Sequence, residues 1–545
     1  MESLSDTDWD VLVAGTGLPQ SLLALALSRS GKKVLHIDKD DIYGGPDAAL
    51  TLQDANTWVK NVTEASNNHL YPFADARIQQ AEEEVSESTS TPNLGLSRSY
   101  SLTLSPQLIY TQSRLISVLV SSHIYQTLEF QAVGNWWLAQ DGDHDTVGSP
   151  DGATGIRVKK IPSGREDVFA DDSINPRSKR ALMKFLRHVM QIHETEEPTT
   201  GDEGNRSFET ILTDSFRLPE ILQQPLLGLS LSPFAANQTP GMFALDRINR
   251  HMRSIGIFGP GFGSLIVKWG GLSEVAQASC RALAVGGGVY VLGRGIESVE
   301  EYGQFQDSSL PDRGLSVALD NGETIKTKWV VGAAPDLPDH LLKSPETPLS
   351  LSARAVYIVS PPLEPLFASN TDSGPSPAGV VVVFPAEMIN LDGPAYLIIH
   401  SSDTGECPSG QCVIYASTSV SSSAASTAAA VQSHDRLDDV VQGLLNSSDL
   451  PVHPKVLWSM HYNQRGISPL DSSAASNQLD QQIPGSSNLP NILAFPPSSL
   501  DISFDDLVID QVKMAWKKIM QDEGDGGVDE SEFMKFESRE NVGDE

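Results

Sequence analysis

The N-terminal segment carries the pattern that most limits how this chain can fold. A short apolar run, Val11 to Ala14, leads into a glycine-rich turn at Gly15 and Gly17, then an amphipathic stretch, a second apolar run and an acid, Asp38. This order of strand, turn, helix, strand and acid is typical of a dinucleotide-binding βαβ unit, in which the acid follows the first glycine by roughly 20 residues. We therefore expect an α/β fold whose parallel sheet begins near the N-terminus.

The same turn leaves the question of a cofactor open. In a complete GxGxxG motif the third glycine lets the helix pack tightly on the strand, and here Gln20 takes that position, just after Pro19. One interpretation is a scaffold in which Gly15, Gly17 and Asp38 only shape the turn. The other is a bound flavin or nicotinamide dinucleotide. The missing glycine favours the scaffold.

Composition excludes several classes of function. The chain has 545 residues and a net charge of −32, which repels nucleic-acid phosphates and anionic lipids. A basic protein partner is favoured, although acidity that only aids solubility is an equal alternative. The three cysteines lack the spacing of a disulfide framework or a zinc site. We find neither the apolar core of a signal peptide nor an apolar run long enough for a membrane helix, so we expect a cytoplasmic protein.

Hydrophobic periodicity divides the chain into two domains. Helical spacing of apolar residues prevails in the middle of the chain, whereas alternating strands and turns follow it. The predicted boundaries are 1–164 and 254–520 for a discontinuous sheet domain, and 165–253 for an inserted all-helical domain. Polar, low-complexity composition predicts mobile insertions near 82–101 and 141–155 and a disordered acidic tail over 521–545.

One predicted helix, Lys179 to Ile192, has a continuous apolar face at positions i, i+3, i+4, i+7 and i+8. Such a face is either ordinary helix-bundle core or one wall of an adaptable apolar pocket. Periodicity does not separate the two. The residues on this face are Leu182, Phe185, Leu186, Val189 and Met190.

A second informative block runs from Lys268 to Leu292. It predicts a helix capped by Ser273, then a glycine cluster and a strand that includes Val291. A polar helix face of this kind is either solvated or a recognition surface. Sequence motifs for a nucleophile, a metal site or a redox pair are missing from the chain, so we expect no catalytic residue. The polar face consists of Glu274, Gln277 and Arg281.

Taken together, the glycine-rich turn, the strand Lys33 to Asp38 and the triplet Tyr43-Gly44-Gly45 resemble the opening of the Rab GDP dissociation inhibitor and Rab escort protein superfamily. The resemblance implies a multi-sheet fold like that of FAD-binding enzymes, without FAD or another cofactor, and an isoprenoid pocket in the helical domain. It also implies a platform that binds Rab GTPases. The platform residues would be Tyr43, Gly44, Gly45, Glu274, Gln277, Arg281 and Val291.

Within this superfamily, the run Arg165 to Phe169 ahead of a helix resembles the escort branch, as do the length and the insertions. That branch implies a non-catalytic accessory subunit of Rab geranylgeranyl transferase. It would bind GDP-bound Rab before and after prenylation, present Rab to the transferase heterodimer, shield the geranylgeranyl groups and touch membranes only transiently. Two alternatives stay open: a Rab GDP dissociation inhibitor and an FAD-dependent oxidoreductase.

Overall fold

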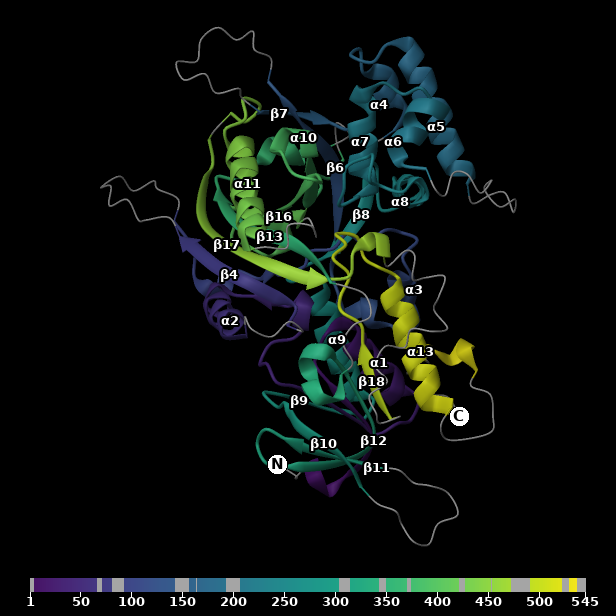
Figure 1. Cartoon of the computed structure of the whole chain (residues 1–545), viewed down its shortest axis with the longest axis vertical. Coiled ribbons are helices and arrows are strands. Elements are labelled where there is room, and N and C mark those ends of the chain that lie inside the picture. The colour runs from purple at the N-terminus through teal and green to yellow at the C-terminus, as the bar shows by residue number, and fades with distance from the viewer. Residues whose placement is uncertain are drawn as a thin grey trace.

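Within the residues that the structure describes, two large β-sheets, a small two-stranded sheet and several helices make up the fold (Figure 1). One sheet, with β1, β2 and β12, lies at the end of the molecule where the N-terminus is found. The larger sheet and the helices α4 to α8 lie at the other end. The computed structural model describes residues 4–65, 71–80, 93–142, 156–162, 164–192, 206–302, 314–342, 349–369, 374–420, 427–451, 453–471, 491–521 and 529–536.

The first sheet confirms the βαβ unit. β1 pairs in parallel with β2 on one side and with β12 on the other, and the helix α1 connects β1 to β2. The order of the sheet is β10-β11-β12-β1-β2-β9, and β18 pairs with the far end of β12. The bounds are β1 Asp8–Ala14, α1 Leu18–Arg29, β2 Val34–Asp38, β9 Val289–Leu292, β10 Ile296–Tyr302, β11 Gly314–Leu319, β12 Thr324–Ala333 and β18 Ile492–Phe495.

Helices cover one face of this sheet because α1 is apolar along most of its length. Leu22 and Leu23 are fully buried among the side chains of α9, Leu272–Val285, and α13, Leu507–Gln521. The opposite face forms a separate cluster around Leu12. The pair Asn321-Gly322 predicts a hairpin turn, and β11 and β12 pair antiparallel on either side of it.

The larger sheet is mostly antiparallel, in the order β4-β17-β13-β16-β15-β14-β6-β7, and β8 pairs with β6. Its strands are β4 Phe73–Gln80, β6 Phe130–Asp141, β7 Ile156–Lys160, β8 Phe262–Val267, β13 Ser350–Ser360, β14 Gly379–Phe384, β15 Ala395–Ser401, β16 Cys412–Val420 and β17 Lys455–Gly466. Smaller elements are the pair β3 Ala49–Leu50 and β5 Leu102–Thr103, with α2 Leu52–Glu64, α3 Arg114–Ser121 and α10 Ala386–Ile389.

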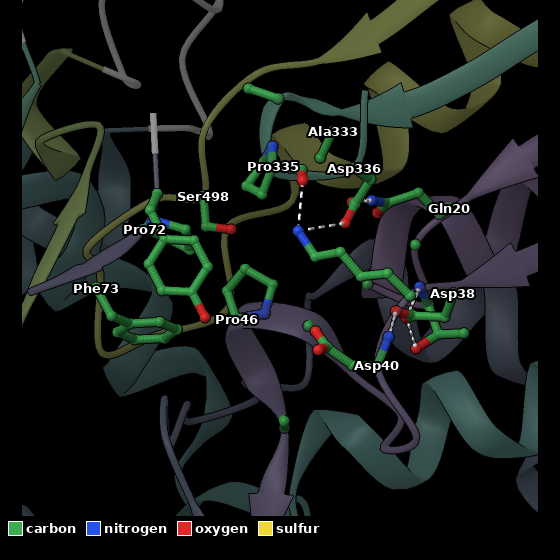
Figure 2. A pocket seen from close by; sticks show the side chains of 18 of the residues that line it. Gln20, Asp38, Asp40, Pro46, Pro72, Phe73, Ala333, Pro335, Asp336 and Ser498 are labelled. Carbon is green, nitrogen blue, oxygen red and sulfur yellow. Dashed lines mark hydrogen bonds and ion pairs between the residues drawn. The ribbon is translucent and has the colours of Figure 1, made fainter. Parts of the chain in front are cut away.

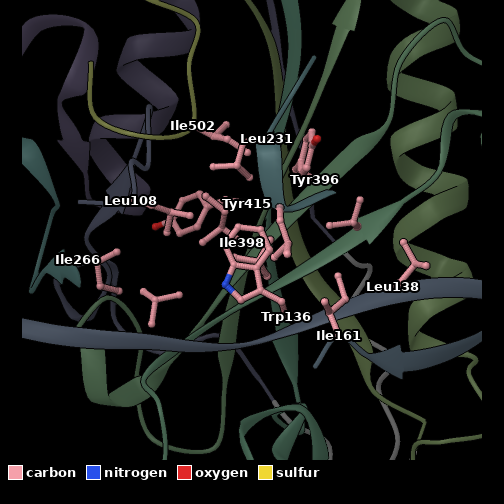
Figure 3. Packing of buried hydrophobic residues seen from close by; sticks show 14 of the residues in the cluster. Leu108, Trp136, Leu138, Ile161, Leu231, Ile266, Tyr396, Ile398, Tyr415 and Ile502 are labelled. Atoms are coloured by element: carbon pink, nitrogen blue, oxygen red, sulfur yellow. The ribbon is translucent and has the colours of Figure 1, made fainter. Parts of the chain in front are cut away.

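Both faces of this sheet are buried. The helix α11, Thr427–Leu445, packs on one face. On the other face, Trp136 and Tyr396 lie in one cluster with Leu231, which follows helix α7, and with Tyr415 from the neighbouring strand (Figure 3). This shared core joins the helices to the sheet.

A group of helices lies between β7 and β8 in the chain. Helix α7 contains Pro225, at which the sequence predicts a break, and this prediction is wrong. Pro225 removes the backbone bond to the carbonyl of Ile221, a residue that is exposed, so water can satisfy that carbonyl. The bounds are α4 Arg165–Ala170, α5 Pro176–Gln191, α6 Phe208–Thr210, α7 Glu220–Ser230 and α8 Gly241–Ser254.

Parts of the segments predicted to be mobile are ordered. Tyr100 is buried, and its hydroxyl donates a hydrogen bond to Gln411 Oε1 (2.7 Å). In the acidic tail, Met534 is buried against α13. The composition of a whole segment does not reveal single apolar side chains of this kind, so the sequence did not predict their burial. The remainder of these predictions, at 82–92, 143–155, 522–528 and 537–545, lies outside the described residues.

Candidate functional site

The glycine-rich turn is closed by the acid that ends β2. Asp38 Oδ2 accepts hydrogen bonds from the backbone N and the Oγ1 of Thr16, both at 2.6 Å, and its Oδ1 accepts from Asp40 N at 2.8 Å. Burial raises the pKa of Asp38, and the bonds from Thr16 oppose that rise. Both carboxylate oxygens are therefore engaged within the turn. In dinucleotide-binding proteins the equivalent acid binds a ribose hydroxyl.

A cavity of about 490 Å³ opens beside this turn, at the carboxyl ends of the parallel strands. Figure 2 shows Gln20 and Asp336 side by side at one edge of this cavity, with Gln20 Nε2 donating to Asp336 Oδ2 at 3.2 Å. A Cβ placed on Gly15 would lie 2.2 Å from that same oxygen, so the carboxylate covers the turn. A diphosphate would meet a carboxylate where it needs backbone N–H groups. The residues present do not fit a dinucleotide.

The Tyr43-Gly44-Gly45 triplet is tied to this turn and to helix α9. Gly44 N donates to Thr16 O (3.2 Å), and Gly45 approaches the backbone of Gly17. Gly44 adopts φ +105°, and a Cβ there would lie 2.9 Å from the Cβ of Ser273 on α9. Only glycine allows this approach. The contact brings two segments more than 200 residues apart in sequence to one surface.

Four of the predicted platform side chains are presented by these two segments. The rings of Tyr43 and Tyr290 lie 6.2 Å apart, and burial, followed by the neighbouring Tyr290 hydroxyl, raises the pKa of Tyr43. Arg281 is exposed, and its Nη2 donates to Gln277 Oε1 at 2.8 Å. Glu274 is half-buried, and burial raises its pKa, although the charge of Arg281 opposes that rise. The result is a mixed aromatic and charged surface.

Val291 does not join this group. Strand alternation turns Val291 towards the cluster on the far face of the sheet, whereas Tyr290 faces α9. The register confirms this assignment, because Tyr290 lies beside His36, whose Nδ1 is 3.6 Å from Cys280 Sγ on α9. Sequence reasoning missed Tyr290, and the period of two along the strand was the signal that could have found it.

The start of α9 also differs from the prediction. The residue before its first turn is Gly271, at φ +63°, and Ser273 lies inside the helix. The hydroxyl of Ser273 donates to Gly270 O at 2.8 Å, so it does not cap the helix. Close packing against Gly44 explains why a small residue occupies this place.

The apolar stripe of α5 divides between two environments. Phe185 is fully buried, with its ring 5.2 Å from that of Phe216, and Val189 lies in the same bundle core. Leu182 and Leu186 instead line a cavity of about 70 Å³ between α5, α7 and the strands β6 and β7. Met190 is partly exposed and lies outside the lining of this cavity. Leu182, Phe185 and Val189 thus belong to the bundle core, and a pocket along this stripe stays a prediction.

Comparison with known proteins is consistent across most of the chain. The family described as GDP dissociation inhibitor matches residues 5–72 and 77–453. The chain is similar to Rab proteins geranylgeranyltransferase component A of Candida albicans, at 28% identity over 75% of this chain and 59% of that protein. It is also similar to the Saccharomyces cerevisiae protein of the same name, at 31% identity over 55% of this chain and 46% of that protein. The matches thus span about half the length of these relatives.

A solved structure shows the same fold. The Rab GDI of Plasmodium falciparum superposes with a TM-score of 0.59 over 94% of this chain and 98% of that one, at 16% sequence identity. In the described part of the chain, no helix combines the length and the apolar character needed to cross a bilayer.

Proposed function

The chain belongs to the GDP dissociation inhibitor family, and from this premise we propose that it acts as a Rab escort protein. It binds GDP-bound Rab GTPases, presents them to the Rab geranylgeranyl transferase heterodimer and carries the prenylated product to membranes. The relatives named as component A of that transferase favour this function.

The observation that carries the proposal is the joint surface of Tyr43 and helix α9. Arg281 offers several N–H donors in a fixed plane, and its bond to Gln277 holds the guanidinium in place before a partner arrives. Glu274 is an acceptor for donors of the GTPase, and Tyr43 supplies a rigid aromatic contact. These are recognition groups, and no proton transfer is required of them.

We place the isoprenoid site at the cavity between α5 and α7, although this cavity must widen before it can hold an isoprenoid chain. Its volume of about 70 Å³ is far below the roughly 300–1,000 Å³ of a ligand pocket. A geranylgeranyl chain therefore enters only if these helices separate. Leu182 and Leu186 would line the opened pocket, while Phe185 and Val189 keep the rest of the bundle together.

We assign no catalysis and no cofactor to this chain. The prenyl transfer belongs to the transferase, and the protein works in the cytosol with transient membrane contact. Asp336 and Gln20 argue against a flavin, because they cover the turn that a diphosphate would need. Flavin-like visible absorbance of the purified protein would contradict this assignment.

A second candidate is a Rab GDP dissociation inhibitor, which the solved relative favours. An inhibitor would extract prenylated Rab from membranes but would not stimulate prenylation. Both candidates use the same platform, so a binding experiment tests what they share.

That experiment is a calorimetric titration of GDP-bound, unprenylated Rab into the full chain. We expect saturable binding that weakens about tenfold or more in Arg281→Ala, since truncated interface arginines commonly cost more than about 1 kcal/mol. Arg436→Ala is the matched control, because Arg436 is also a helical arginine paired to a nearby residue, Asp439. Equal binding by both variants and the unmodified protein would contradict the platform.

A further inference from the structure

The cavity beside the glycine-rich turn has a charge opposite to that of a phosphate site. Among its described lining residues, two are basic, Lys39 and Arg465. Five are acidic: Asp38, Asp40, Asp41, Asp54 and Asp336. Since Asp38 is fully engaged by the turn, Asp336, whose side chain is 17% exposed, is the carboxylate available to the open volume. A ligand that enters here meets a negative field.

The chain already places an ammonium group in this cavity. Lys39 reaches in from the rim, and its Nζ donates to Pro335 O at 2.5 Å. The same Nζ lies 4.0 Å from Asp336 Oδ1 and 6.0 Å from the centroid of the Tyr71 ring. A carbonyl, a carboxylate and an aromatic face together are what recognises an organic ammonium.

One lysine does not neutralise the site. Burial raises the pKa of Asp336 to about 7, and the nearby carboxylates Asp38 and Asp40 add to the rise, while Lys39 opposes it. The side chain of Lys39 is 37% exposed, so its charge is partly screened by water. A second cation, held inside the cavity, would therefore be stabilised.

The remaining wall suits an apolar or aromatic group. Trp58 and Phe73 stack edge to face with ring centroids 5.0 Å apart, and Pro46 and Pro72 extend the same wall. The volume of about 490 Å³ falls within the range of small-molecule sites, roughly 300–1,000 Å³. The cavity therefore has an acidic end and an aromatic end. A ligand that complements it carries a positive charge at one end and an apolar group at the other.

We propose that this cavity binds a small organic amine in its protonated form. Its ammonium group would take the place of Lys39 against Pro335 O and Asp336, and its apolar part would lie against Trp58 and Phe73. The cavity lies where a dinucleotide-binding protein holds its anionic cofactor, but here it would bind a cation. The proposal does not depend on the function proposed above.

Phenethylamine is a suitable probe, titrated calorimetrically into the full chain at pH 8. We expect saturable binding with one site per chain. Its neutral isostere 2-phenylethanol should bind at least about tenfold more weakly, because it lacks the charge that the carboxylate recognises. ADP should give no saturable heat. Failure of phenethylamine to saturate, or equal binding of the alcohol, would overturn the proposal.

Two variants locate the site. Asp336→Asn should weaken amine binding about tenfold or more, whereas Asp403→Asn, at an exposed acid elsewhere, should leave it unchanged. Lys39→Met should tighten binding severalfold, because it removes the tethered competitor. If Asp336→Asn does not fold, Lys39→Met decides alone. Unchanged or weaker affinity in Lys39→Met places the amine elsewhere and contradicts the proposal.

Discussion

The substitution Gly44→Ala tests the contact that joins the two halves of the candidate site. Gly44 has φ +105°, and an added Cβ would lie 2.9 Å from Ser273 Cβ and 3.0 Å from Ala48 Cα. The left-handed backbone conformation costs an alanine roughly 1–2 kcal/mol. The two close contacts add about 1–3 kcal/mol, because neither neighbour is the end of a flexible side chain. Alanine also leaves the unfolded chain less conformational freedom than glycine does, which raises the free energy of unfolding by about 0.4–1 kcal/mol.

We therefore expect Gly44→Ala to lower the free energy of unfolding by about 1–5 kcal/mol in urea denaturation. Because relief of the contact moves the Tyr43 loop away from α9, affinity for GDP-bound Rab should also fall about tenfold. Gly322→Ala is the matched control: Gly322 has φ +84°, but no atom of the described residues lies within 4 Å of the added Cβ. That variant should lose about 1 kcal/mol and keep its Rab affinity. If both variants lost the same stability and kept the same Rab affinity, the close contact between Gly44 and α9 would not be the cause, and the reasoning would be refuted.

Three further predictions follow from single side chains. Burial raises the pKa of Asp47 from 3.8 to about 7, so its ionisation opposes folding as pH rises through that window. Asp47→Asn should therefore match the unmodified protein near pH 4 and exceed its stability at pH 8 by on the order of 1–4 kcal/mol in urea titrations. Phe185→Ala should cost about 3–5 kcal/mol in the same assay, and Leu186→Ala clearly less, because Leu186 faces a cavity. In Rab titrations Tyr290→Ala should weaken binding, whereas Val291→Ala should not, since Val291 lies on the other face of the sheet.

The sequence was sufficient for features that depend on neighbours along the chain. Apolar runs around Gly15 and Gly17 predicted the βαβ unit, and Asn321-Gly322 predicted the hairpin of β11 and β12, because turn chemistry and periodicity are local. Periodicity also identified the apolar stripe of α5, of which Leu182, Phe185 and Val189 are buried.

Long-range features escaped prediction for a physical reason. Asp336 contacts Gly15 although the two are more than 300 residues apart in sequence, and no local sequence pattern indicates that contact. The choice between Tyr290 and Val291 depended on strand register, and the start of α9 depended on the backbone conformation of Gly271, at φ +63°. Pro225 was tolerated in α7 because the carbonyl it leaves unpaired belongs to an exposed residue.

The most direct test of the proposed function is transfer of geranylgeranyl to a purified GDP-bound Rab by the transferase heterodimer. The reaction would be measured with the unmodified protein, with Arg281→Ala, with Arg436→Ala and with no added protein. We predict that transfer requires the unmodified protein or Arg436→Ala, and that Arg281→Ala supports it only at higher concentration. Transfer that is unaffected by this protein, although Rab binds it, would contradict the escort function and favour the inhibitor.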